Sequence, residues 1–167
     1  MLEIINNLKP FFENCYARVN VRQYARLMRI TPPTASTLLK SYEKHGLLVI
    51  EKDRNYIMFH SNRESRNFIM LSRIYWQGKL KELTKFIEQA PPDAIVLFGS
   101  LSKGETRPDS DIDLAIFGID ELDVGDFEKQ LKRKIQTFWF GSLKEIKNAN
   151  LRNNIINGHV LSGRLEL

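Results

Sequence analysis

The sequence contains few of the residues that build disulfide or zinc frameworks. Cys15 is the single cysteine in 167 residues, so no disulfide can form within the chain. The three histidines, His45, His60 and His159, lack the spacing of metal ligands, which argues against a zinc site. No apolar run is long enough to cross a bilayer, and the first residues do not follow the pattern of a secretory leader. We therefore expect a cytoplasmic protein without membrane contact.

Charge is spread unevenly along a chain that is otherwise globular in composition. With 43% hydrophobic and 27% charged residues, the sequence predicts ordered domains with real cores. Residues 1–90 hold 15 Lys and Arg against 8 Asp and Glu, whereas residues 91–167 hold 10 against 12. The first part is thus suited to face a polyanion, and the second to gather divalent cations.

Two short helices are predicted near the beginning of the chain. Asn20 can cap a helix over residues 21–28, with Gln23 closing a capping box. Thr31 can cap a second helix that begins at proline and ends before Gly46. Its apolar residues share one face at helical spacing: Ala35, Leu38, Leu39 and Tyr42. Its outward face is small, polar and cationic, and consists of Thr34, Thr37, Lys40, Ser41 and Lys44.

Residues 47–60 form two β-rich runs around the polar turn 52–55, which predicts a hairpin tipped with Lys52 and Arg54. This order of elements resembles a winged helix-turn-helix domain, in which the second helix enters the DNA major groove and the wing touches the backbone. The resemblance implies DNA contacts from the outward helix residues and from Lys52 and Arg54. RNA contact, or a role in dimerisation or protein binding, remains an alternative.

Residues 64–90 carry an apolar stripe at helical spacing and predict one long helix. Such a stripe is typical of a core or of a dimer seam, so a homodimer is one expectation. "APPD", residues 90–93, ends the helix. The predicted domains are therefore 1–62, a linking helix over 63–90, and 91–167.

The stretch "FGSLSKGETRPDSDIDLAIF", residues 98–117, combines a phosphate-binding pattern with paired acids. After the apolar strand 94–98, Gly99 allows close backbone approach, and Ser100 begins a helical turn that Gly104 closes. Asp111 and Asp113 then point to the same face of a second strand. Two such carboxylates repel each other, so a cation is expected between them, and Mg²⁺ prefers oxygen ligands of this kind.

This arrangement resembles the polymerase beta-type nucleotidyltransferase superfamily, in particular its minimal members, and with the winged helix it resembles two-domain proteins of archaeal type. The resemblance implies an α+β fold with a mixed sheet flanked by helices. It implies that Asp111 and Asp113 bind Mg²⁺ or Mn²⁺, and that an NTP, ATP first among them, is the substrate. It further implies phosphate contacts from four residues: Gly99, Ser100, Lys103 and Gly104.

One departure from the family pattern leaves catalysis open. Many members carry a third carboxylate on a later strand, but the predicted strand 134–141 contains no acid. Gln136, Thr137 or Phe138 stands at the expected place, and the next carboxylate is Glu145. Glu105, Arg107 and Asp109 lie in the connecting loop, which we expect to be solvated or to form a mobile cover.

The sequence therefore leaves three functions open. The first is a Mg²⁺-dependent enzyme that transfers a nucleoside monophosphate to a hydroxyl of a protein, small molecule or nucleic acid. The second is a DNA-binding regulator whose second domain binds nucleotide or a protein partner without turnover. The third is an antitoxin-type nucleotidyltransferase that neutralises a toxin.

Overall fold

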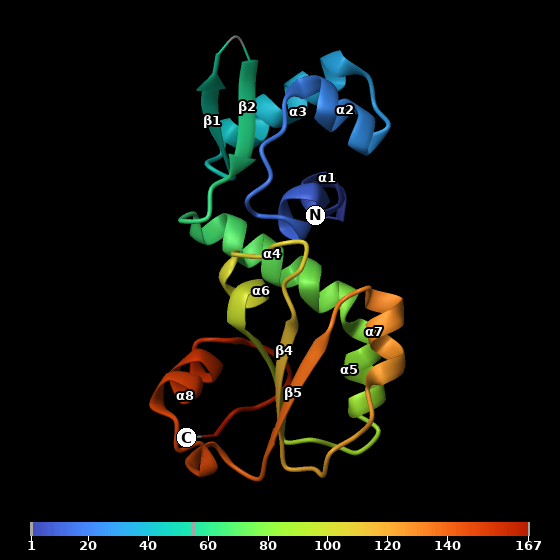
Figure 1. Cartoon of the computed structure of the whole chain (residues 1–167), viewed down its shortest axis with the longest axis vertical. Helices are drawn as coiled ribbons and strands as arrows, with labels where there is room; N and C mark the ends of the chain where they lie inside the picture. The colour runs from blue at the N-terminus through green and yellow to red at the C-terminus, as the bar shows by residue number, and fades with distance from the viewer. Residues whose placement is uncertain (1, 55, 167) are drawn as a thin grey trace. The chain divides into compact units, whose positions relative to one another are not determined.

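The structure is a computed structural model that describes residues 2–54 and 56–166 (Figure 1). The chain divides into two compact units. The first covers the chain up to Tyr75 and also residues 104–108. The second covers residues 76–103 and the chain from Asp109 onward. The division therefore falls inside a helix, between the two boundaries that the sequence suggested.

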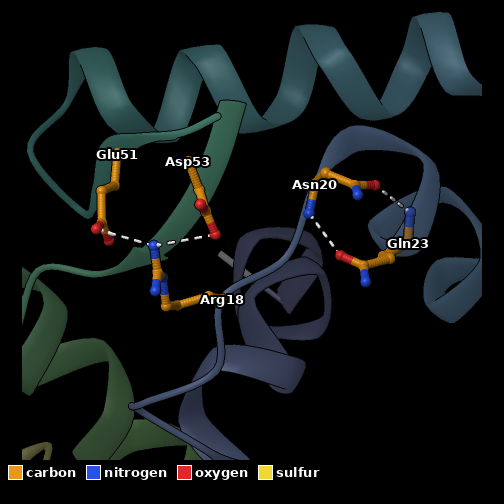
Figure 2. A network of polar contacts seen from close by, with 5 residues as sticks. All are labelled: Arg18, Asn20, Gln23, Glu51 and Asp53. Carbon is orange, nitrogen blue, oxygen red and sulfur yellow. Dashed lines mark hydrogen bonds and ion pairs between the residues drawn. The ribbon is translucent and has the colours of Figure 1, made fainter. Parts of the chain in front are cut away.

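The first unit begins with α1 (Leu2–Glu13), α2 (Val21–Met28) and α3 (Pro32–Lys44). The capping box of α2 is confirmed: the Gln23 backbone N–H donates to Asn20 Oδ1, and the Asn20 N–H donates to Gln23 Oε1, both at 2.9 Å (Figure 2). α2 ends at Arg29, which has a left-handed backbone with φ of 55°. Thr31 caps α3, as predicted. The local sequence thus determines where both helices begin.

The predicted hairpin is also present, as β1 (Leu48–Asp53) and β2 (Tyr56–Ser61). The two strands are antiparallel, with Leu48 opposite Ser61 and Asp53 opposite Tyr56. Asn55, in the predicted turn, lies outside the described residues. α1 contributes Leu8, Phe11 and Phe12 to a core with residues of α2, α3 and β2. The helices and the hairpin therefore share one hydrophobic core.

The single helix predicted over 64–90 is wrong: the structure has α4 (Arg66–Lys79) and α5 (Lys81–Ile87). The interruption is at Leu80, whose ψ is 1° instead of the roughly −42° of an α-helix. Gly78 weakens the last turn of α4, and the change of direction accompanies complete burial of the Leu80 side chain. Tertiary packing therefore outweighs the helical periodicity of the sequence.

The second unit is built on a mixed sheet with the order β5-β4-β3-β6. Its strands are β3 (Ala94–Phe98), β4 (Ile112–Phe117), β5 (Ile135–Phe140) and β6 (His159–Gly163). β3 runs antiparallel to β4 and β6, and β4 runs parallel to β5. The mixed α+β architecture expected from the sequence is confirmed.

Helices cover both faces of this sheet (Figure 1). α8 (Ala149–Ile156) and the 3₁₀ turn η1 (Leu143–Glu145) pack on one face, against Val96, Ala115 and Phe117. α5 and α7 (Gly125–Leu131) lie on the other, where Phe86 and Phe127 pack with ring centroids 5.3 Å apart. The short helix α6 (Gly99–Lys103) follows β3 directly. Among the described residues, no helix combines the length and apolar character needed to cross a bilayer.

Candidate functional site

The two predicted carboxylates lie at the beginning of β4. Asp111 directly precedes the strand, and Asp113 is its second residue. Asp113 is opposite Phe98 of β3 and Gln136 of β5. Because paired residues share a face of a sheet, Asp113 lies on the α8 face, together with Ala115 and Phe117. The acids are therefore at the end of the sheet where β3 enters α6.

Gly99 makes room for one of these acids. It follows Phe98 and has a φ of +69°, in the region that favours glycine. A Cβ atom at this position would lie 2.0 Å from Oδ2 of Asp113, far inside van der Waals contact. The sequence predicted that Gly99 allows a ligand to approach. The structure shows that it allows the Asp113 carboxylate to lie against the backbone, and ligand approach stays a prediction.

The other residues predicted to bind phosphate belong to different units. Ser100 is partly exposed near the beginning of α6, and the exposed Lys103 donates from Nζ to Oδ1 of Asn154 in α8 at 2.9 Å. Gly104 belongs to the first unit, where a Cβ would meet Ile69 at 3.2 Å. The second unit thus brings together Gly99, Ser100 and Lys103 with the acids, but does not include Gly104.

Gln136 contacts the acids directly. Its Nε2 donates to Oδ2 of Asp111 at 2.9 Å, so the side chain at the expected place of a third acid is an amide that fixes a carboxylate. Glu145 cannot take that place, because it accepts from the Gly141 N–H beyond the opposite end of β5. The described part of the chain contains no group of three or more Asp, Glu, His and Cys residues arranged to hold a metal.

The surroundings of Asp113 disfavour the charged form of its carboxyl group. Burial, and then the negative charge of Asp111, raises the pKa of Asp113 to about 6 from its ordinary 3.8. A divalent cation would remove both causes, because it neutralises the pair and replaces lost solvation. The donor set consists of oxygens, which suits Mg²⁺, with water and phosphate oxygens completing the coordination. The residues present therefore fit a magnesium ion.

The family model described as polymerase beta, nucleotidyltransferase matches residues 81–166, a little over half of the chain. The chain belongs to this family. The match covers the whole mixed sheet, including both strands that position the acids. No curated protein and no solved structure matches the chain. Membership suggests nucleotidyl transfer in general.

The nucleotidyltransferase domain contains one buried cation that sequence reasoning missed. Arg133 is 9% exposed, and its Nη1 donates to the Ser110 carbonyl at 2.7 Å. Its guanidinium lies 5.1 Å from the centroid of the Trp76 ring. Arg133 therefore holds the backbone just before Asp111. Its place in the basic run 132–134 gave no local signal of this contact.

The loop between Lys103 and Asp109 combines exposed charged residues with one buried contact. Thr106 is fully buried, and its carbonyl accepts from the Cys15 N–H at 2.8 Å. The Arg107 guanidinium lies 3.9 Å from the Tyr16 ring centroid, and Arg63 contacts the same ring at 4.2 Å. Glu105 and Asp109 are exposed. Arg107 is exposed as well, so the expectation of a solvated loop holds for the three charged residues, while Thr106 packs in the first unit.

The structure places the residues predicted to contact nucleic acid in different environments. Lys40 and Lys44 are exposed on α3, and Lys52 and Arg54 are exposed at the hairpin. Ser41 is half-buried and borders an apolar cavity of about 450 Å³. The remaining hydroxyls make local hydrogen bonds: Thr37 Oγ1 donates to the Pro33 carbonyl, and Thr34 Oγ1 pairs with Thr31 Oγ1.

Proposed function

We propose that the protein is a Mg²⁺-dependent nucleotidyltransferase that transfers a nucleoside monophosphate from an NTP, ATP first among them, to a hydroxyl acceptor. One observation carries the proposal. Asp113 lies against Gly99 two residues after Asp111, and burial, followed by the negative charge of Asp111, raises the pKa of Asp113 to about 6.

Each residue of the site has a role in this reaction. Asp111 and Asp113 would hold the cation, and Gln136 orients Asp111. Ser100 and the adjoining backbone N–H groups would bind the terminal phosphates, and Lys103 offsets their charge. A bound Mg²⁺ supplies electrostatic stabilisation of the phosphates and of the departing pyrophosphate. The acceptor oxygen forms a bond to the α-phosphorus while the bond to the pyrophosphate oxygen breaks. Gln136 cannot take the acceptor proton, so it passes to solvent.

The test is label transfer from an α-³²P-labelled NTP with Mg²⁺ to nucleic-acid, small-molecule and protein acceptors, including a candidate toxin. We expect transfer by the parent and its loss in Asp111→Asn and Asp113→Asn. Asp126→Asn is the matched control, because Asp126 is an exposed acid of the same domain that pairs with Lys129. Absence of both transfer and Mg-NTP binding at millimolar concentration would contradict the proposal.

We further propose that α2, α3 and the β1-β2 hairpin form a winged helix-turn-helix that binds DNA. Arg18 supports this, since it contacts Glu51 at 2.8 Å and Asp53 at 3.9 Å on one face of β1 (Figure 2). Because side chains alternate along a strand, Lys52 points away from these acids. The acids of the hairpin therefore do not cancel its cations.

Lys40→Ala with Lys44→Ala tests DNA binding. The double variant should bind duplex DNA more weakly, with the slope of log K against log salt reduced by about 0.9 per lost phosphate contact. Lys129→Ala, in the other unit, should leave the slope unchanged. An unchanged slope for the α3 variant, or no binding by the parent, would instead favour a protein-binding role.

The hydrogen bond between Gln136 and Asp111 favours a second candidate. In this alternative the nucleotidyltransferase domain of a DNA-binding regulator binds Mg-NTP without turnover, because the amide of Gln136 cannot serve as a base and no third acid joins the pair among the described residues. Tight Mg-NTP binding, lost in Asp113→Asn, with no transfer to any acceptor would favour this candidate over the enzyme.

A further inference from the structure

Three arginines of α2 and the turn after it line one hollow on the first unit. Arg22, Arg26 and Arg29 border a cavity of about 420 Å³. Its remaining lining consists of Ala25, Ile30 and Pro32. Arg22 and Arg26 are four residues apart on α2, which places them on one face of the helix. Arg29 follows the end of the helix and borders the same cavity, and we call the three arginines the row. All three are exposed, so the row is available to a ligand in the isolated chain.

The charge of this row is not balanced nearby. From Asn14 to Tyr42 the sequence has no Asp or Glu, whereas it has Lys40 and four arginines. Of the ion pairs formed by described residues, those in this stretch involve Arg18, which contacts Glu51 and Asp53 of the hairpin. None neutralises the three arginines of the row. An anionic ligand would meet no repulsion from a carboxylate within this segment.

The backbone of Arg29 allows a substitution that separates charge from folding. It adopts a left-handed conformation with φ of 55° and ψ of 42°, where glycine is the favoured residue. Lys132 has the same backbone conformation at the end of α7, so the conformation by itself does not indicate a ligand. It does mean that glycine can replace Arg29 and remove its charge without straining the backbone.

We propose that Arg22, Arg26 and Arg29 bind consecutive phosphates of a nucleic-acid backbone. Arg22 and Arg26 lie about 6 Å apart along the helix axis, at about 1.5 Å per residue, and Arg29 adds a third cation beyond the helix end. Three cations spread in this way suit a polymeric anion better than a single phosphate. Guanidinium groups bind phosphate through paired hydrogen bonds. The inference rests on the proposed DNA-binding function, and it adds a contact surface on α2 to the lysines of α3.

The test measures binding of the full chain to a fluorescent 30-base-pair duplex DNA by anisotropy over a series of KCl concentrations. The variant combines Arg22→Ala, Arg26→Ala and Arg29→Gly. We expect its dissociation constant to be roughly tenfold or more higher, and its salt slope to fall by about 2.7, or about 0.9 for each phosphate contact. A duplex RNA of the same length is measured in parallel.

Arg29→Gly alone separates binding from folding. Because glycine suits the left-handed backbone, the variant should unfold at an equal or higher temperature while its salt slope falls by about 0.9. Lys132→Gly is the matched control, since Lys132 is an exposed cation with φ of 53° at the end of α7 in the other unit. It should gain stability in the same way without a change in salt slope.

The outcomes distinguish this inference from the function on which it rests. If the lysine variant of α3 weakens binding but the arginine variant does not, the inference fails and DNA binding stands. If the parent binds neither duplex, both fail. If the arginine variant loses only RNA binding, the phosphate contact stands and the assignment to DNA fails. Equal changes in slope for Arg29→Gly and Lys132→Gly would also overturn the inference.

Discussion

Asp113 is a negative side chain that the folded protein accommodates poorly on its own. Its carboxylate lies against Gly99, and burial, followed by repulsion from Asp111, raises its pKa to about 6. The unfolded chain has no such environment, so there the group keeps an ordinary value near 3.8. The folded state therefore binds this proton more tightly than the unfolded state, and stability falls as pH rises from about 4 to about 6.

Asp113→Asn should be more stable than the parent above pH 6. The full shift would correspond to about 3 kcal/mol, and screening at a partly exposed side chain reduces the expected gain to about 1–2 kcal/mol at pH 8. The gain should disappear near pH 4, where the parent carboxyl is protonated. Urea unfolding at both pH values measures this, and Mg²⁺ should stabilise only the parent. A gain that does not depend on pH would contradict the electrostatic explanation.

Gly99→Ala should disrupt the acid site and destabilise the fold. The added Cβ lies in a left-handed backbone and would overlap Oδ2 of Asp113. Gly46→Ala is the matched control, because Gly46 has nearly the same φ of +68° with nothing within 4 Å of an added Cβ. We expect the control to lose about 1 kcal/mol of unfolding free energy, and Gly99→Ala to lose clearly more. Equal losses would mean that Asp113 moves aside freely.

At the scale of elements, the site depends on where α8 packs. The sheet residues Val96, Ala115 and Phe117 form a core with Ile155 of this helix. Asn154, one residue earlier, accepts the hydrogen bond from Lys103. α8 thus both covers the face that carries the acids and positions the cation of α6.

Asn148→Ala tests the stability of α8. Asn148 Oδ1 accepts from the backbone N–H groups of Asn150 and Leu151, so it caps the helix. Loss of this cap should lower the free energy of unfolding by about 1 kcal/mol, as measured by denaturant unfolding. Asn150→Ala is the control, because the Asn150 backbone N–H, not its side chain, makes the cap contact. A loss of similar size in the control would show that the cap is unimportant.

At the scale of the whole molecule, chain order and compact units do not coincide. Residues 104–108 follow α6 of the second unit in sequence, yet they belong to the first unit. There the Thr106 carbonyl accepts from the Cys15 N–H, and Arg107 stacks on Tyr16. Burial is the main cause of a raised pKa for the Cys15 thiol, so the folded protein should hold it in an unreactive form.

Arg107→Ala should release this loop and expose Cys15. Losing the contact with Tyr16 weakens the anchor of the segment that carries Thr106, so local opening becomes more frequent. Ellman's reagent should then modify Cys15 several-fold faster than in the parent. Arg63→Ala is the matched control, because Arg63 contacts the same ring from outside the loop. The same rate in the parent and the Arg107 variant would contradict an anchoring role for Arg107.

The sequence by itself determined the features that depend on near neighbours. The caps at Asn20 and Thr31, the hairpin and the strand that carries Asp113 all follow from patterns within a few residues. The expectation that Asp111 and Asp113 share a face came from strand alternation, although the strand begins at Ile112, after Asp111. The helix α1 gave no comparable signal, and it contains Pro10, which normally disfavours a helix interior.

Only the tertiary structure decided the contacts between distant parts of the chain. Gln136 meets Asp111 because β5 pairs with β4 in parallel, Lys103 meets Asn154 because α8 packs near α6, and the helix after residue 64 breaks where Leu80 is buried. Local periodicity specifies which face a side chain occupies. It does not specify which strand becomes the neighbour or in which register, because that choice depends on how all elements bury their apolar faces together.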